Sequence, residues 1–145
     1  MRDYTKIEAW KLADDFTVAI YSATKSFPRE ELYGLTSQIR RAAYSAPANI
    51  AEGASRGSKK DYLHFLYISR GSLSEAQYFV HLAQRLGFLS AEQAGQLQAR
   101  GGQAQACLQG LINAVEREVG TVSRTLAKIT SLLVTCLGAA IVRNQ

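Results

Sequence analysis

The sequence contains few of the residues that build disulfide-rich, metal-binding or irregular proteins. Its 145 residues include two cysteines, two prolines and two histidines. Cys107 and Cys136 are too far apart for a paired metal-binding motif and provide no disulfide framework. His64 and His81 do not have the spacing of a metalloprotease helix, and no glycine-rich phosphate loop occurs. We therefore expect a protein that is not an enzyme, with no metal site and no cofactor.

The beginning of the sequence, MRDYTKIEAW, lacks the apolar core of a signal peptide. This absence predicts a cytoplasmic location. Hydrophobic residues make up 47% of the chain and charged residues 20%. That balance is sufficient for one packed core and excludes a charge-rich disordered chain. The scarcity of proline, together with frequent Ala, Leu, Gln, Glu and Arg, predicts an all-α fold.

Four segments repeat apolar and small residues at steps of three and four, which is typical of helices packed on one face. We expect the helices to begin near Thr5, Arg29, Ser58 and Ser90. Short connections, including a glycine turn at Gly87, favour antiparallel neighbours. The sequence therefore predicts an antiparallel up-and-down four-helix bundle over residues 1–119. Residues 120–145 form a helical C-terminal extension of the same domain.

Pro47 falls inside the second predicted helix, where proline removes one backbone hydrogen bond. The 3/4 spacing keeps its phase across Pro47, which predicts that the helix continues with a kink. Ser45 or Asn49 is expected to bond the carbonyl group that the proline leaves unpaired.

The C-terminal extension keeps the same spacing, with Val122, Leu126, Ile129 and Leu133 in phase. We expect it to be helical beyond a hinge near Gly120. Its most apolar part, Leu132 to Val142, is shorter than the roughly 20 residues that span a membrane. We expect it to pack against a partner subunit and not to enter a membrane.

A polar ridge runs along the second predicted helix beside its apolar face. It consists of Gln38, Arg41, Ser45, Asn49 and Glu52. An ordinary surface helix spreads its polar residues over a broad outer face. We expect this ridge to be largely buried, between helices or between subunits, where paired polar groups fix the register of packing.

Positive charge is concentrated in two stretches of a chain whose net charge is +5. Residues 33–60 carry five basic residues and one acid, which is +4, and residues 121–145 carry three basic residues and no acid, which is +3. Such concentration attracts phosphate backbones. The candidate nucleic-acid-binding residues are Arg40, Arg56, Lys59 and Lys60. A solvated face, or pairing with acids elsewhere, is the alternative.

Three segments carry a resemblance to a known family: FPREELYGL, QIRRAAYSAPANIAEG and GSLSE. They resemble the bacterial four-helix-bundle proteins called 23S ribosomal RNA intervening sequence proteins, which are related to accessory proteins of diversity-generating retroelements. The resemblance extends from about Tyr4 to Val115. It implies an up-and-down bundle that assembles as a homo-oligomeric ring, usually a pentamer, and it implies nucleic-acid binding.

Two functions are consistent with these observations. The first is a non-enzymatic oligomer that binds RNA or DNA through a basic surface, as an accessory to a nucleic-acid-processing protein. The second is a structural assembly module whose partners are proteins, with no nucleic-acid role.

Overall fold

The computed structural model of the protein describes the backbone of residues 2–142 and the side chains of residues 2–121. Within this part of the chain every regular element is a helix, which confirms the all-α prediction. The long helices are α1 (Glu8–Ala23), α2 (Leu35–Ser55), α3 (Lys59–Arg85) and α4 (Ala91–Val142). Short 3-10 turns cover Tyr4–Lys6, Thr24–Ser26 and Arg29–Glu31.

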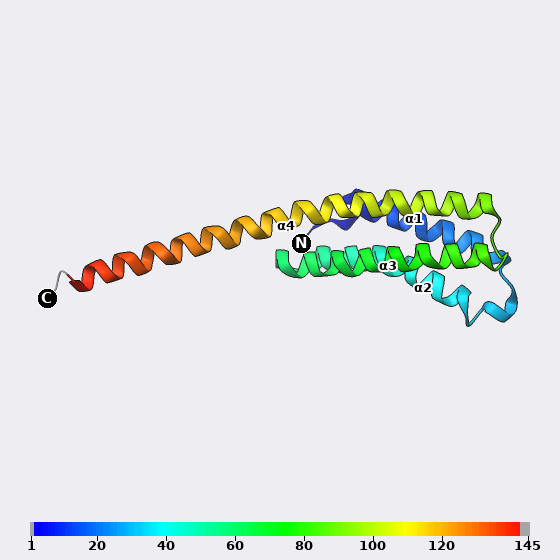
Figure 1. Ribbon diagram of the computed structural model, residues 1–145, viewed down its shortest axis with the longest axis horizontal. Helices are drawn as coiled ribbons and strands as arrows, with labels where there is room; N and C mark the ends of the chain where they lie inside the picture. Colours follow the sequence, from blue (N-terminus) through cyan, green and yellow to red (C-terminus); the bar gives the residue numbers. More distant parts are fainter. Residues whose placement is uncertain (1, 143–145) are drawn as a thin grey trace.

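The four helices pack side by side as a bundle in which each helix contacts two others (Figure 1). Contacts between α2 and α3 run in opposite directions along the two helices: Ser45 bonds Ser72, whereas Ala46 bonds Ser69. The same reversal relates α3 to α4, since Lys59 pairs with Glu118, whereas Gln77 further along α3 accepts from Gln98 near the start of α4. These contacts describe antiparallel neighbours, as the short connections predict.

Two of the four expected helix starts, Ser58 and Ser90, agree with the structure, as does the turn at Gly87. The predicted start of the second helix near Arg29 is wrong, because Arg29–Glu31 form a separate 3-10 turn and α2 begins at Leu35. Ser58 caps α3 by accepting from the amide of Asp61 at 3.0 Å. Gly87 has a φ of +77° and ends α3, and Ser90 with Gln93 forms a reciprocal cap at α4. The predicted start at Thr5 is wrong. Asp3 accepts from the Thr5 amide in a separate 3-10 turn, and α1 begins at Glu8.

Helix α4 continues without interruption through Gly120, so the predicted hinge is absent. Figure 1 shows its second half, coloured orange to red, projecting beyond the ends of the other three helices. The Lys59–Glu118 ion pair of 2.8 Å lies close to the point where α4 leaves the bundle. The segment beyond it is the helical C-terminal extension.

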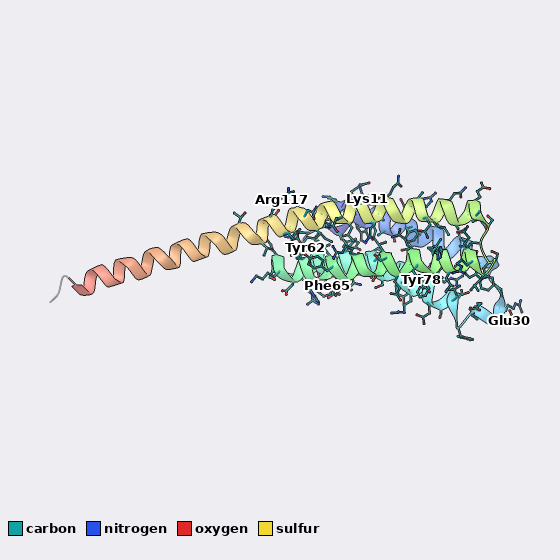
Figure 2. The ribbon with its side chains drawn as sticks, viewed as in Figure 1. Lys11, Glu30, Tyr62, Phe65, Tyr78 and Arg117 are labelled. Carbon is teal, nitrogen blue, oxygen red and sulfur yellow. The ribbon has the colours of Figure 1, made fainter. Side chains whose placement is uncertain are left out.

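The core is made of one buried side-chain cluster along the bundle axis. Helix α2 contributes mostly small residues, so that its neighbours approach its backbone closely. Its buried residues are Leu35, Thr36, Ile39, Ala42, Ala43, Ala46, Pro47, Ile50, Gly53 and Ala54. Larger side chains from the other helices fill the remaining space, and Figure 2 shows one of them, Tyr62, between α3 and α4.

Pro47 lies inside a continuous α2, as the sequence predicts. The carbonyl group of Ala43, which would accept from residue 47 in a regular helix, instead accepts from the Thr17 hydroxyl of α1 at 2.9 Å. One turn along, the Ala46 carbonyl accepts from the buried Ser69 hydroxyl of α3 at 2.9 Å. The expected role of Ser45 or Asn49 is therefore wrong, because the neighbouring helix α1 provides the donor.

The Thr17 hydroxyl is predicted to stabilise the fold. Thr17→Val keeps the shape of the side chain but leaves the buried Ala43 carbonyl unpaired, at a cost of about 1–3 kcal/mol in unfolding free energy. Thr36→Val is the matched control, because the buried Thr36 hydroxyl has no hydrogen-bond partner among the described residues. Urea denaturation should show a loss for Thr17→Val and no loss for Thr36→Val; equal effects would contradict this account.

Gly53 is predicted to be required for the close approach of α2 to α3. A Cβ atom at Gly53 would lie 2.8 Å from Phe65 Cβ and 3.3 Å from the Tyr62 carbonyl oxygen. Gly53→Ala should therefore destabilise the bundle by about 1–3 kcal/mol. Gly102→Ala, where no atom lies within 4 Å of the new Cβ, should instead stabilise it by up to about 1 kcal/mol. Thermal unfolding of both variants measures the difference, and a stabilised Gly53→Ala would refute the packing argument.

Candidate functional site

Basic side chains gather at the end of the bundle from which α4 projects. The loop after α2 places Arg56 there, the first turn of α3 adds Lys59 and Lys60, and α4 adds Arg117. All four side chains are exposed. Figure 2 shows Arg117 on α4 near this end of the bundle. We call Arg56, Lys59, Lys60 and Arg117 the bundle-end cluster.

Two members of the bundle-end cluster form ion pairs with exposed carboxylates. Arg56 pairs with Glu52 one turn earlier, and its guanidinium lies 5.0 Å from the centre of the Phe65 ring. Lys59 Nζ lies 2.8 Å from Glu118 Oε2, and this hydrogen bond holds the pKa of Glu118 below its ordinary value. Lys60 and Arg117 make no ion pair with any side chain that the structure describes. The cluster therefore combines two partly neutralised cations with two that retain their full charge.

The first turn of α3 also carries an acid. Asp61 accepts from the Ser58 hydroxyl at 2.7 Å, and its own amide donates to Ser58 Oγ at 3.0 Å. A carboxylate at this position complements the positive end of the helix dipole. The attraction of this end for an external anion thus comes from the side chains of the bundle-end cluster.

Arg40, the fourth predicted nucleic-acid-binding residue, lies elsewhere. Its Nε donates to Thr24 Oγ1 at 2.8 Å, and its guanidinium lies 4.9 Å from the centre of the Tyr21 ring. Arg56 follows Arg40 by 16 positions, which correspond to about 24 Å along a helix. The structure therefore brings Arg56, Lys59 and Lys60 together and leaves Arg40 in contact with the end of α1.

The tyrosines near the basic residues divide between core and surface. Tyr62 is 1% exposed, and burial raises the pKa of its hydroxyl. The Arg2 guanidinium covers its ring at 4.4 Å. Tyr67 is exposed and donates its hydroxyl to Glu116, which raises the pKa of Tyr67. Tyr67 is therefore the surface ring of the two, and it lies in the first part of α3, as Lys59 and Lys60 do.

The polar ridge of α2 faces α3 and is only partly covered within one chain. Arg41 pairs with Glu75 at 3.3 Å, and Ser45 bonds Ser72 at 2.9 Å. Asn49 donates to the Ser45 carbonyl at 2.7 Å. Burial within the chain is partial for Ser45 and Asn49, whereas Gln38, Arg41 and Glu52 are exposed. The expectation of burial between helices of one chain is thus wrong for the ends of the ridge, and burial between subunits stays a prediction.

The described residues contain no group of three His, Cys, Asp or Glu side chains placed to hold a metal ion. Cys107 is half-buried, and burial raises the pKa of its thiol, which lowers the thiolate fraction at neutral pH. Cys136 lies outside the residues whose side chains the structure describes. In the part with described side chains, no helix is both long enough and apolar enough to cross a membrane.

Sequence reasoning missed the contributions of Arg117, Glu118 and Arg2 to this end of the bundle. Arg117 and Glu118 follow the last residue of the α2–α3 loop, Ser58, by 59 and 60 residues. Only the antiparallel pairing of α3 with α4 brings them to the loop. In two antiparallel helices joined by a short turn, residues equally far from the turn lie opposite one another. Counting from the α3–α4 turn could therefore have placed Arg117 and Glu118 near the start of α3. Arg2 has no such signal, because its amide reaches the Ala54 carbonyl at 3.0 Å from an irregular N-terminal segment.

Comparison with known proteins agrees with this architecture. A solved structure from Bacteroides thetaiotaomicron, described as a protein with unknown function from the S23 ribosomal protein family, is 24% identical with a TM-score of 0.67. The match covers 72% of this chain and 97% of that chain. None of the curated proteins matches the chain. Residues 5–110 match the family described as 23S rRNA-intervening sequence protein. This match covers more than half of the sequence, and the chain therefore belongs to the 23S rRNA-intervening sequence protein family.

Proposed function

We propose that this protein is a non-enzymatic, oligomeric helical bundle that binds the phosphate backbone of RNA or DNA as an accessory factor, in the cytoplasm, beside a nucleic-acid-processing protein. The observation that carries the proposal is the bundle-end cluster. Its four basic side chains are exposed and come from three separate elements of the chain. Such a cluster binds phosphates by releasing their counterions, without reading base sequence.

The ion pairs within the cluster are compatible with this role. Both partners of the Arg56–Glu52 pair and of the Lys59–Glu118 pair are roughly half exposed. Exposed pairs of this kind contribute at most about 1 kcal/mol each. A phosphate group can therefore replace the carboxylate as partner at little cost to the fold.

The charge continues from the cluster along α4. Arg124 and Lys128 follow Arg117 at steps of seven and four residues, which places all three positions along one side of the helix. No acid follows Glu118 in the sequence. The positive potential thus extends from the bundle end along the start of the projecting helix, as an elongated polyanion requires.

Changing Arg56, Lys59 and Lys60 together to Glu is predicted to weaken nucleic-acid binding at least about tenfold at low salt, because three phosphate-binding charges are reversed. Fluorescence anisotropy with a mixed-sequence RNA and a duplex DNA of equal length measures the effect. The parent protein should show a slope of log K against log salt of about −3 to −4 for four phosphate contacts.

A matched control reverses three exposed lysines elsewhere, Lys6, Lys11 and Lys25. It has the same net charge as the cluster variant and should bind like the parent. Equal losses in both variants would mean that net charge, and not the cluster, governs binding. A parent protein that binds neither probe at low salt would overturn the proposed function.

The second candidate function is a protein assembly module, and the exposed ends of the polar ridge favour it. Hydrogen-bonding groups remain at the surface of one chain on Gln38, Arg41 and Glu52. They lie along the same row of α2 as the residues that pair with α3. A second subunit that covers this ridge would bury paired polar groups and fix its own register. The two functions are compatible, since the ridge and the bundle-end cluster involve largely different residues.

Glu52→Ala tests the ridge. Within one chain it removes an exposed pair one helical turn apart, so that unfolding free energy should change by no more than about 0.5 kcal/mol. If the ridge is a subunit interface, the same change should lower the mass of the assembly in light scattering. Glu8→Ala, which removes an equally exposed pair with Lys11 on α1, should leave the mass unchanged. A monomeric parent, or an unchanged mass for Glu52→Ala, would exclude the ridge interface.

A further inference from the structure

In the described backbone, residues 2–142, no other helix covers the projecting part of α4. Within the residues whose side chains are described, the Lys59–Glu118 ion pair lies close to where α4 leaves α3. Figure 1 shows the helix continuing alone from there. From Val119 to Val142 it has 24 residues, which correspond to about 36 Å of helix.

Inside the bundle, α4 packs through a regular stripe of apolar side chains. Leu108, Ile112 and Val115 are buried, and Val119 is half-buried against the same core. Their spacing alternates between four and three residues. This spacing averages 3.5 residues, the repeat that keeps one face of a helix turned towards its partners over a long distance.

The same alternation continues beyond the bundle without a change of phase. After Val119, the next positions of the repeat are Val122, Leu126, Ile129, Leu133, Cys136 and Ala140. We call these six positions together with Val119 the α4 seam. The face of α4 that α1 and α3 cover inside the bundle is thus continuous with the α4 seam, along which no other helix of the chain lies (Figure 1).

An isolated helix of this composition is not expected to be stable by propensity alone. Most helical stability in proteins comes from packing of the apolar face. Gly120 and Gly138 lie within the projecting part of α4, and each costs about 1 kcal/mol relative to alanine. The α4 seam therefore requires a partner surface.

We propose that the α4 seam packs against the α4 seams of other copies of this chain, forming a helical bundle separate from the four-helix bundle. The distribution of charge identifies this partner. From Val119 to Val142 the only charged residues are Arg124 and Lys128, and both have register positions away from the seam. Charges beside a seam normally select the partner and its orientation. Their absence beside this seam allows identical copies to associate without opposing like charges.

Other occupants fit less well. The uncharged stretch Ile129–Val142 has 14 residues, about 21 Å of helix, whereas the hydrocarbon core of a bilayer is about 30 Å thick. An acidic partner helix would be attracted to Arg124 and Lys128, which would place it on the side opposite the seam. Association between copies is the arrangement in which every seam position is covered. It does not rest on nucleic-acid binding.

The test uses the full chain with two seam positions changed, Leu126→Lys and Leu133→Lys. Lysine at these positions would bring positive charges together wherever seams meet. Sedimentation velocity over a range of protein concentrations should show an apparent dissociation constant at least about tenfold weaker than that of the parent. The control Ser131→Lys with Thr135→Lys adds the same two charges at positions outside the seam and should associate like the parent.

Three results would overturn the inference. They are a parent that is monomeric at all concentrations, a seam variant that associates as tightly as the parent, and equal weakening by both lysine pairs.

A further arm mixes each protein with vesicles of phosphatidylcholine and phosphatidylglycerol. A parent that floats with the vesicles but is monomeric without them would show that lipid covers the seam. Far-UV circular dichroism confirms that the bundle of each variant is folded. The Glu triple variant of the bundle-end cluster should associate normally, which separates this inference from nucleic-acid binding.

Discussion

The hydrogen bond from Thr17 to the Ala43 carbonyl is the contact on which the arrangement of this bundle depends. Pro47 lies in the middle of the most closely packed helix, where the unpaired carbonyl would cost about 1–3 kcal/mol if buried without a partner. Thr17 removes that cost only if α1 packs at one distance from α2 and at one position along the helix axis. The buried Ser69 hydroxyl fixes α3 against α2 as well, because it needs an acceptor and the Ala46 carbonyl provides one. Two buried hydroxyl groups therefore set the register of three helices around one proline.

That register determines which surfaces remain available to partners. Because α1 and α3 approach α2 over alanine and glycine, the polar ridge of α2 lies at the edge of the α2–α3 contact. Its centre is paired within the chain, and its ends are exposed. The packing also brings the start of α3 against α4, so that Lys59 meets Glu118. The bundle-end cluster is thus a consequence of the antiparallel register, and its position coincides with the point at which α4 leaves the bundle.

The sequence predicts the elements of this fold better than the contacts between them. Residue spacing, Gly87 and the caps at Ser58 and Ser90 are local signals, and the structure agrees with each of them. The partner of the Ala43 carbonyl could not be predicted locally, because Thr17 is 26 residues away and reaches it only after the helices pack. Arg40 and Arg56 belong to the same basic stretch of the sequence, but α2 holds them about 24 Å apart. The close contact at Gly53 could not be predicted locally either, because it depends on how near α3 approaches α2.

The bundle-end cluster and the α4 seam would support one another energetically. A single bundle-end cluster contains four cations, two of which already have carboxylate partners. One such cluster is expected to bind nucleic acid weakly at physiological salt, because each phosphate contact is screened. Association through the α4 seams would hold several clusters on one assembly, and binding by the first cluster would then raise the effective concentration of phosphates near the next. Arg124 and Lys128, at positions away from the seam, would remain on the outside of such an assembly. In such an assembly, a chain with modest net charge would bind a polyanion tightly without any site that is tight by itself.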